Sequence, residues 1–214
     1  MSSPENSLPH QGAEAETWAR IPSDLDALRT QCWNGAFHAY ATSYIFQRRA
    51  RILKKRVQWI TYIGFAVPMV VGLIVLAYSH LKSLPIVIAV AAALGIGQAA
   101  ISLWAIVGGW VDGATYAATS AAANDHFAAR YTDLAENPPA NMGVFQEQYH
   151  VLRAEDRART EQDFQQGVKE AEKHMGMRAS LRKYQRECAA CGVIPVSMKA
   201  TDCGVCGEFR YRIR

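Results

Sequence analysis

The chain has 214 residues, of which 50% are hydrophobic and 20% are charged, and its formal net charge is +4. Its mean hydropathy of −0.07 is ordinary for a soluble protein, yet residues 57–79 and 83–111 contain no charged residue. Each of these segments exceeds the roughly 20 apolar residues that cross a bilayer as a helix. The sequence therefore excludes a wholly soluble globule and leaves too little chain for a large enzyme domain.

The N-terminal part is predicted to be a disordered tail, residues 1–22, followed by a long helix. The tail is mostly polar, and Ser23 can cap a helix directly after Pro22. Four aromatic residues in this helix recur every three or four positions and share one face: Trp33, Phe37, Tyr40 and Tyr44. This aromatic stripe either packs against other helices or binds a planar ligand such as a nucleobase. Cys32, beside it, is expected to be a buried thiol.

Positive charge marks the expected membrane topology. Six basic residues lie immediately before the first uncharged segment, Arg48, Arg49, Arg51, Lys54, Lys55 and Arg56, whereas Lys82 is the only one between the two segments. Basic residues accumulate on the cytoplasmic side of membrane helices. We therefore expect two spans within membrane lipid, at about 57–79 and 84–111, with both termini cytoplasmic and the link between the spans external.

The second span carries a face of small or polar residues: Ala91, Gly95, Gln98, Ser102, Ala105, Gly109 and Asp112. Small residues allow membrane helices to pack closely, which is the simpler explanation. The alternative is a pore lining, because an amide such as Gln98 is costly at membrane depth unless it is paired or faces water. Two spans cannot enclose a pore, so a pore requires a homo-oligomer, most simply a tetramer.

Two helical stretches are expected after the second span. The first ends at Asn137-Pro138-Pro139, because proline disfavours a helix at the residue before it. The second runs from about Gly143 to Glu187, with apolar strips at helical spacing on either side of a polar middle.

The last part of the chain contains two C-x2-C pairs, Cys188 with Cys191 and Cys203 with Cys206, each followed by glycine. A C-x2-C turn brings two thiolates to one metal, and two such turns complete a tetrahedral site. We predict a structural Zn²⁺ site within a small β zinc ribbon, residues 188–214. Disulfides are disfavoured in a reducing cytoplasm, and an iron site with the same spacing stays open.

The chain ends in alternating arginines, Arg210, Arg212 and Arg214. The alternation predicts a strand with one cationic face. That face is either a seat for phosphates or single-stranded nucleic acid or a charged strand edge that prevents aggregation.

The order of a basic helix, two spans, cytoplasmic helices and paired cysteines resembles the bacterial mobilome proteins named for their CxxC-x11-CxxC pattern. Residues 23–187 are similar to the SLATT domains, which are two-transmembrane effectors with nucleotide-related partners. The resemblance implies an oligomeric effector of the bacterial inner membrane in anti-phage defence. Its control would come from a nucleotide or oligonucleotide signal, or from a partner nucleotidyltransferase, and the aromatic stripe and terminal arginines are the predicted ligand-binding residues.

No enzymatic motif accompanies these features: the six histidines lack metal-ligand spacing and no phosphate-binding loop is present. The predicted fold is a mostly α membrane protein, with a two-transmembrane hairpin, long cytoplasmic helices and the ribbon. Two functions compete, a pore-forming effector and a membrane-tethered module that binds nucleic acid or protein through the ribbon.

Overall fold

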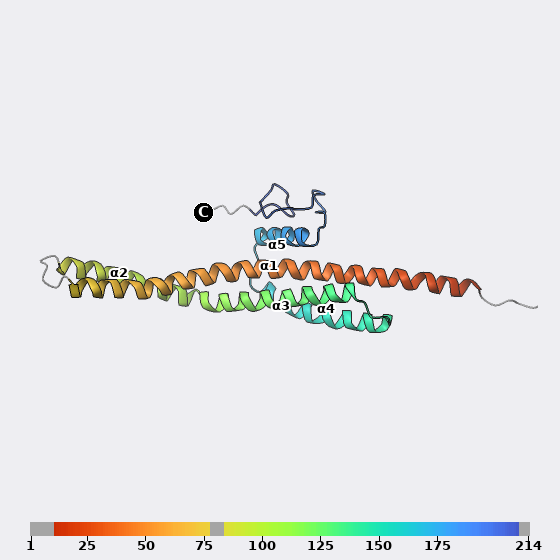
Figure 1. Cartoon of the computed structure of the whole chain (residues 1–214), viewed down its shortest axis with the longest axis horizontal. Coiled ribbons are helices and arrows are strands. Elements are labelled where there is room, and N and C mark those ends of the chain that lie inside the picture. Colours follow the sequence, from red (N-terminus) through yellow and green to blue (C-terminus); the bar gives the residue numbers. More distant parts are fainter. Residues whose placement is uncertain (1–10, 78–83, 210–214) are drawn as a thin grey trace, which may run out of the picture. The chain divides into compact units, whose positions relative to one another are not determined.

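The computed structural model describes residues 11–77 and 84–209 (Figure 1). Five helices account for most of these residues: α1 (Gln11–Ala77), α2 (Leu84–Val107), α3 (Trp110–Glu136), α4 (Met142–Phe164) and α5 (Glu170–Lys183). The mostly helical prediction is therefore confirmed. The first helix begins at Gln11 instead of Ser23, so residues 11–22 of the predicted tail lie within α1.

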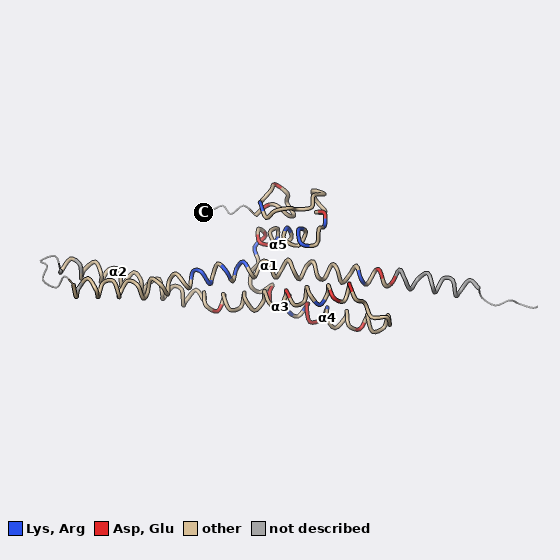
Figure 2. Tube along the Cα trace, in the orientation of Figure 1, with Lys and Arg blue, Asp and Glu red and all other residues tan. Residues whose placement is uncertain are grey.

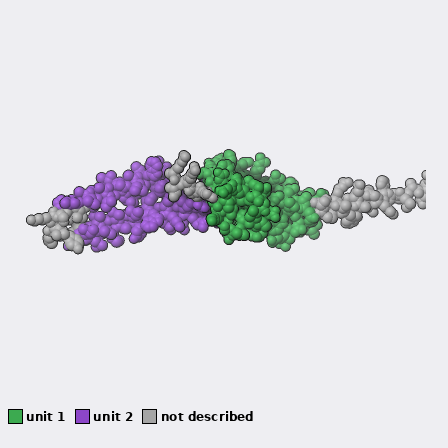
Figure 3. Space-filling model, turned by 90° about the horizontal axis from the view of Figure 1, so that it is seen from above, with its two compact units in different colours: residues 1–42, 123–214 green, residues 43–122 purple. Residues whose placement is uncertain are grey.

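The chain forms two compact units (Figure 3). Residues 43–122 form one, called here the hairpin unit, and residues 1–42 with 123–214 form the other, called here the cysteine unit. Helix α1 contributes to both units, and the boundary also crosses α3. The four cysteines therefore belong to the same compact unit as α4 and α5.

The core of the cysteine unit lies among α1, α3 and α4. Its buried residues are Leu28, Cys32, Ala36, Tyr131, Leu134, Ala135, Phe145, Tyr149 and Leu152. Gly35 allows the ring of Tyr131 to approach α1, because a Cβ at Gly35 would lie 2.8 Å from Cε1 of that ring. Cys32 is fully buried, as predicted, and burial raises the pKa of its thiol to about 11.

Helix ends follow local signals in the sequence. Helix α3 ends at Glu136, directly before the Asn137-Pro138-Pro139 sequence, as predicted. Helix α4 starts after Asn141, whose side chain accepts hydrogen bonds from the backbone N–H groups of Gly143 and Val144.

Two glycines interrupt helices that the sequence predicts as continuous. Gly109 has a φ of +59°, and α2 ends at Val107 instead of residue 111, which leaves Asp112 in the first turn of α3. Gly167 has a φ of +58°, and it divides the stretch predicted from Gly143 to Glu187 into α4 and α5. Glycine adopts this left-handed conformation without a steric penalty, so the chain turns at both positions.

The hairpin unit contains two helices that are long and apolar enough to cross a membrane, with a mean hydropathy of 1.8 within residues 24–74 and 1.9 within residues 88–107. Figure 2 shows α2 and the adjoining end of α1 free of Lys, Arg, Asp and Glu, next to the basic segment of α1. The predicted apolar segments therefore form helices over their described parts, while residues 78–83 of the predicted link lie outside the described residues.

Candidate metal centre

Two backbone turns of the same kind position the four cysteines. In the first, the N–H of Gly192 donates to the carbonyl of Cys188 at 2.8 Å, and in the second, the N–H of Gly207 donates to the carbonyl of Cys203 at 2.9 Å. Each turn places both cysteines of its C-x2-C pair on one side, so that two sulfurs come from each turn. The four sulfur atoms all lie within 4.8 Å of one another.

The sulfur geometry fits a tetrahedral metal ion. Sγ of Cys188 lies 3.9 Å from Sγ of Cys203, and Sγ of Cys191 lies 3.9 Å from Sγ of Cys206. Four thiolates at about 2.3 Å from one Zn²⁺ are separated by about 3.8 Å in a regular tetrahedron. A disulfide requires about 2.05 Å, and all four cysteines are free. The cluster is thus consistent with zinc or with another metal that prefers thiolates.

The two glycines after the cysteine pairs have different roles. Gly192 has a φ of +65°, which favours glycine. Gly207 permits a close approach, since a Cβ there would lie 2.0 Å from Oγ1 and 2.7 Å from the carbonyl oxygen of Thr201. The same contact includes a hydrogen bond from the N–H of Thr201 to the carbonyl of Gly207 at 3.0 Å. Gly207 therefore fixes the second turn against the loop that precedes it.

The environments of two thiols in the second turn differ. The backbone N–H groups of Cys206 and Val205 donate to the sulfur of Cys203 and lower the pKa of its thiol. Burial raises the pKa of the Cys206 thiol, and the neighbouring thiols act in the same direction. Metal binding would deprotonate the thiols, because a coordinating cation replaces the thiol protons.

A buried arginine of α5 faces the second turn. Arg178 is only 7% exposed, and its Nε donates to the carbonyl of Ser197 at 2.7 Å. Its Nη1 lies 3.4 Å from the carbonyl oxygen and 3.8 Å from Sγ of Cys206. A guanidinium at this position offsets the negative charge of four thiolates. This role of Arg178 is not predictable from the sequence, because nothing in the helical pattern of α5 links it to a cysteine 28 residues later.

The cysteine cluster packs on α1 through the aromatic stripe. Cys188 and Cys206 share a buried cluster with Phe37 and Leu181. Ser180 Oγ donates to the carbonyl of Phe37 at 2.8 Å. These contacts anchor α5, which directly precedes the first cysteine turn, on the α1 segment that carries the stripe.

Tyr184 is the partner of the stripe within the cysteine unit. Its ring centroid lies 6.3 Å from that of Trp33, 6.1 Å from that of Phe37 and 6.1 Å from that of Tyr40. Its hydroxyl donates to the carbonyl of Ala36 at 3.2 Å. The three aromatic residues are therefore engaged in helix packing, the first of the two explanations offered by the sequence. Tyr44 lies in the hairpin unit and is half-buried.

A comparison with protein families shows to which family the chain belongs. Residues 29–209 match the family described as mobilome CxxCx(11)CxxC protein. The chain belongs to this family. The match includes the aromatic stripe, all of α2 to α5 and both cysteine pairs, so the family resemblance stated from the sequence is confirmed. No curated protein and no solved structure matches the chain, and the similarity of residues 23–187 to SLATT domains stays a prediction.

The structure around the cysteines differs from the β ribbon that the sequence predicts for residues 188–214. Residues 184–209 consist of turns and irregular chain, and no strand occurs in this range. The short segment between the cysteine pairs is held by turn hydrogen bonds and by Arg178 instead of a β ladder. The β ribbon is thus not confirmed. The predicted ligand-binding residues Arg210, Arg212 and Arg214 lie outside the described residues.

The predicted pore-lining face is recognisable on α2. Ala91, Gln98, Ser102 and Ala105 are half-buried, whereas Gly95 and most other α2 residues are exposed. Nε2 of Gln98 donates to the carbonyl of Ile60 in α1 at 3.3 Å, and it lies 3.5 Å from Oγ of Ser102.

Further along the helix, the same face borders a groove that it shares with α1. Ala91 lines an apolar groove together with Val67 and Val70 of α1. At these positions the face therefore packs within the hairpin. Gly109 and Asp112 follow the end of α2, so a single straight helix does not carry the whole face.

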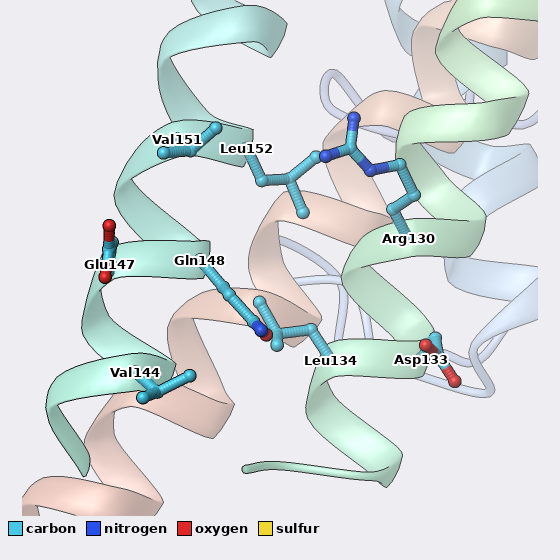
Figure 4. A pocket seen from close by; sticks show the side chains of 8 residues that line it. All are labelled: Arg130, Asp133, Leu134, Val144, Glu147, Gln148, Val151 and Leu152. Carbon is cyan, nitrogen blue, oxygen red and sulfur yellow. The ribbon is translucent and has the colours of Figure 1, made fainter. Parts of the chain in front are cut away.

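A groove of about 550 Å³ lies between α3 and α4 in the cysteine unit (Figure 4). Its walls combine apolar and charged side chains: Arg130, Asp133, Leu134, Val144, Glu147, Gln148, Val151 and Leu152. Arg130 forms an ion pair with Glu155 of α4.

Proposed function

We propose that this protein is a membrane-tethered binding module of the bacterial inner membrane, with a cytoplasmic domain stabilised by Zn²⁺. The apolar part of α1 and helix α2 form the membrane hairpin, and both chain termini are cytoplasmic. Support comes from the two apolar helices and from the charge distribution, since no Asp or Glu lies between Asp26 and Asp112 while six basic residues precede the first apolar segment.

The observation that carries the proposal is the hydrogen bond from Gln98 to Ile60. An amide at membrane depth requires a partner, and here a carbonyl of the same hairpin supplies it. The small residues beside Gln98 then serve close packing between α1 and α2. The Gln98 amide thus has a hydrogen-bond partner within the hairpin and does not need a water-filled path, as expected of an anchor.

The metal site supports a structural role rather than an enzymatic one. Four cysteines complete a tetrahedral site and leave no open position for a substrate or a reactive water. Loss of metal should therefore unfold the cysteine turns, and the protein is proposed to have no catalytic activity. The cytoplasmic domain is proposed to bind a protein or a nucleic acid.

An oligomeric pore is the second candidate, favoured by small exposed residues on α2. A Cβ placed at Gly95 or Gly97 meets no atom within 4 Å, so the backbone of another copy can approach closely there. In this candidate a tetramer acts as a pore-forming effector in anti-phage defence, controlled by a nucleotide or oligonucleotide signal or by a partner nucleotidyltransferase.

Membrane depolarisation in cells separates the two candidates. Cells express the wild-type chain, alone and together with its neighbouring genes, or variants with Gln98→Leu or Ser102→Leu. If the protein is a tether, no condition should depolarise the membrane. In a separate binding assay, Cys203→Ser should abolish binding of the protein or nucleic-acid partner, because it removes a metal ligand. Depolarisation by the wild-type chain that Gln98→Leu or Ser102→Leu alters contradicts the tether and supports the pore.

A further inference from the structure

A second groove, within the hairpin unit, combines an apolar wall with a basic rim. It lies between α1 and α3 and has a volume of about 570 Å³. Val57, Val111, Ala114 and Ala118 contribute to the apolar wall, and Arg51 and Lys54 contribute the positive charge. We call this feature the collar groove.

The position of the collar groove matches the expected membrane surface. Val57 is the first residue of the first uncharged segment, and Val111 is the last residue of the second, and both line the groove. Trp59 and Tyr62, one turn further along α1, are 65% and 66% exposed and their rings pack edge to face. Exposed Trp and Tyr side chains are typical of the membrane interface. The groove therefore begins where phospholipid headgroups lie.

Basic residues outnumber acidic ones in the sequence around the collar groove, where Asp112 directly follows the lining residue Val111. Asp112 is the only Asp or Glu in residues 43–122, whereas six basic residues lie between positions 48 and 56. Nε of Arg51 donates to the carbonyl of Gln47 at 3.4 Å, and no carboxylate pairs with Arg51 or Lys54 among the described residues. An anion is the complementary ligand for two cations beside an apolar wall.

The threonine hydroxyls at the groove are already used by helix α3. Oγ1 of Thr115 donates to the carbonyl of Val111 at 3.1 Å, and Oγ1 of Thr119 donates to the carbonyl of Thr115 at 3.0 Å. Recognition of a ligand therefore depends on Arg51, Lys54 and Gln58 from α1. These groups donate hydrogen bonds to phosphate oxygens, and the apolar wall contacts the adjoining glycerol and acyl carbons.

We propose that the collar groove is a binding site for an anionic phospholipid of the cytoplasmic leaflet. The phosphate headgroup lies against Arg51 and Lys54, and the apolar part of the lipid lies along Val57 and Val111. This site rests on the membrane location proposed above. It gives α1 and α3 a defined lipid contact at the membrane surface, beyond general attraction between a basic segment and a negative membrane.

Native mass spectrometry of the detergent-purified full chain tests the proposal. The probes are dioleoylphosphatidylglycerol and dioleoylphosphatidylcholine, which share acyl chains and differ in headgroup charge. The wild-type chain should bind the anionic lipid at a concentration roughly tenfold lower than the zwitterionic lipid, because each basic residue near the surface adds to the attraction. This preference should disappear in the double variant Arg51→Gln with Lys54→Gln.

Two further variants separate a defined site from diffuse charge. Ala118→Leu narrows the groove at an exposed position without changing the charge, and it should also remove the preference. Arg48→Gln with Arg49→Gln removes the same charge from the same helix outside the groove, and it should retain the preference. An unchanged helical circular dichroism spectrum and melting temperature of each purified variant reports that it folds.

Three results would overturn the proposal: equal binding of both lipids by the wild-type chain, an unchanged preference in Ala118→Leu, or equal losses in the two double variants. A protein dimer that Ala118→Leu dissociates would assign the groove to a second copy instead. The assay uses solubilised protein, so its failure is distinguishable from failure of the proposed tether, which would appear as depolarisation or as a chain recovered in the soluble fraction.

Discussion

At the scale of single residues, the metal centre depends on more than its four sulfurs. Arg178 connects α5 to both the carbonyl of Ser197 and the second cysteine turn, and Gly207 is the residue that fits against Thr201. The sequence predicted the four cysteines because their spacing is a local pattern. It did not predict Arg178, whose contact depends on how the loop after α5 folds back.

Replacement of Arg178 by methionine should weaken metal binding. The variant keeps an unbranched apolar stem of similar length to the aliphatic part of arginine but removes the charge and the hydrogen bonds near Cys206, and loss of such supporting contacts typically costs about 10–100-fold in metal affinity. Competition with a coloured zinc chelator measures the affinity. Arg182→Met is the control, because Arg182 is exposed on the same helix; equal affinities of the two variants would contradict this role of Arg178.

Asp156 gives the cysteine unit a defined pH dependence. Burial raises the pKa of its carboxyl, although the Tyr131 hydroxyl donates to its Oδ2 at 3.2 Å. The folded state therefore retains the proton to a higher pH than the unfolded state does, and the stability linked to this proton falls as the pH rises above the ordinary carboxyl range near 4. The charged form of the Asp156 carboxyl is thus disfavoured in the folded state.

The variant Asp156→Asn tests this linkage. Its melting temperature relative to the wild-type protein should increase as the pH rises from about 4 towards neutral, since the amide carries no charge at any pH. A difference in melting temperature that stays constant over this pH range would refute the assignment.

At the scale of elements, α1 is a helix whose sequence changes along its length. Its aromatic stripe packs on α5 in the cysteine unit, and its apolar end contributes to the hairpin unit. The helical spacing predicted both faces. The breaks at Gly109 and Gly167 could not be placed from spacing alone, because a glycine inside a helical pattern is compatible with either a helix or a turn.

Phe37 should couple the packing of α1 to the metal centre. It is 6% exposed and shares a buried cluster with Cys188 and Cys206, so Phe37→Ala should destabilise the cysteine unit by about 3–5 kcal/mol and accelerate zinc release. Chemical denaturation and the rate of zinc transfer to a chelator measure the two effects. His38→Ala, at the next position, which is exposed, should change neither the stability nor the rate of zinc release. If Phe37→Ala retains zinc as well as the wild-type protein does, the packing of α1 does not influence the metal centre.

At the scale of the whole molecule, the chain combines an apolar hairpin with a domain organised around four thiolates. Composition predicted this combination, because charge is absent from two segments and cysteine is concentrated in another. Composition could not predict the partner of Gln98: an amide at membrane depth indicates that some partner exists, and only the packing of α2 against α1 identifies the carbonyl of Ile60.

The topology prediction can be tested with a single cysteine introduced at Lys82 in a chain whose Cys32 is replaced by serine and whose four cluster cysteines stay protected by metal. An impermeant thiol reagent should label position 82 in intact spheroplasts, because the six basic residues before the first apolar segment hold that side in the cytoplasm. A cysteine introduced at Ser2 should be labelled only after permeabilisation. The reverse labelling pattern would show that the link is cytoplasmic and the N-terminus external, and would contradict the prediction.

We propose that this chain lies in the membrane and holds one metal ion with four cysteines. Elemental analysis of protein extracted from washed membranes tests both parts of this proposal. We expect one equivalent of zinc per chain, and a loss of that zinc in Cys188→Ser or Cys206→Ser. Protein from the membrane fraction with well under one equivalent of zinc or iron, or with unchanged metal after either substitution, would contradict it.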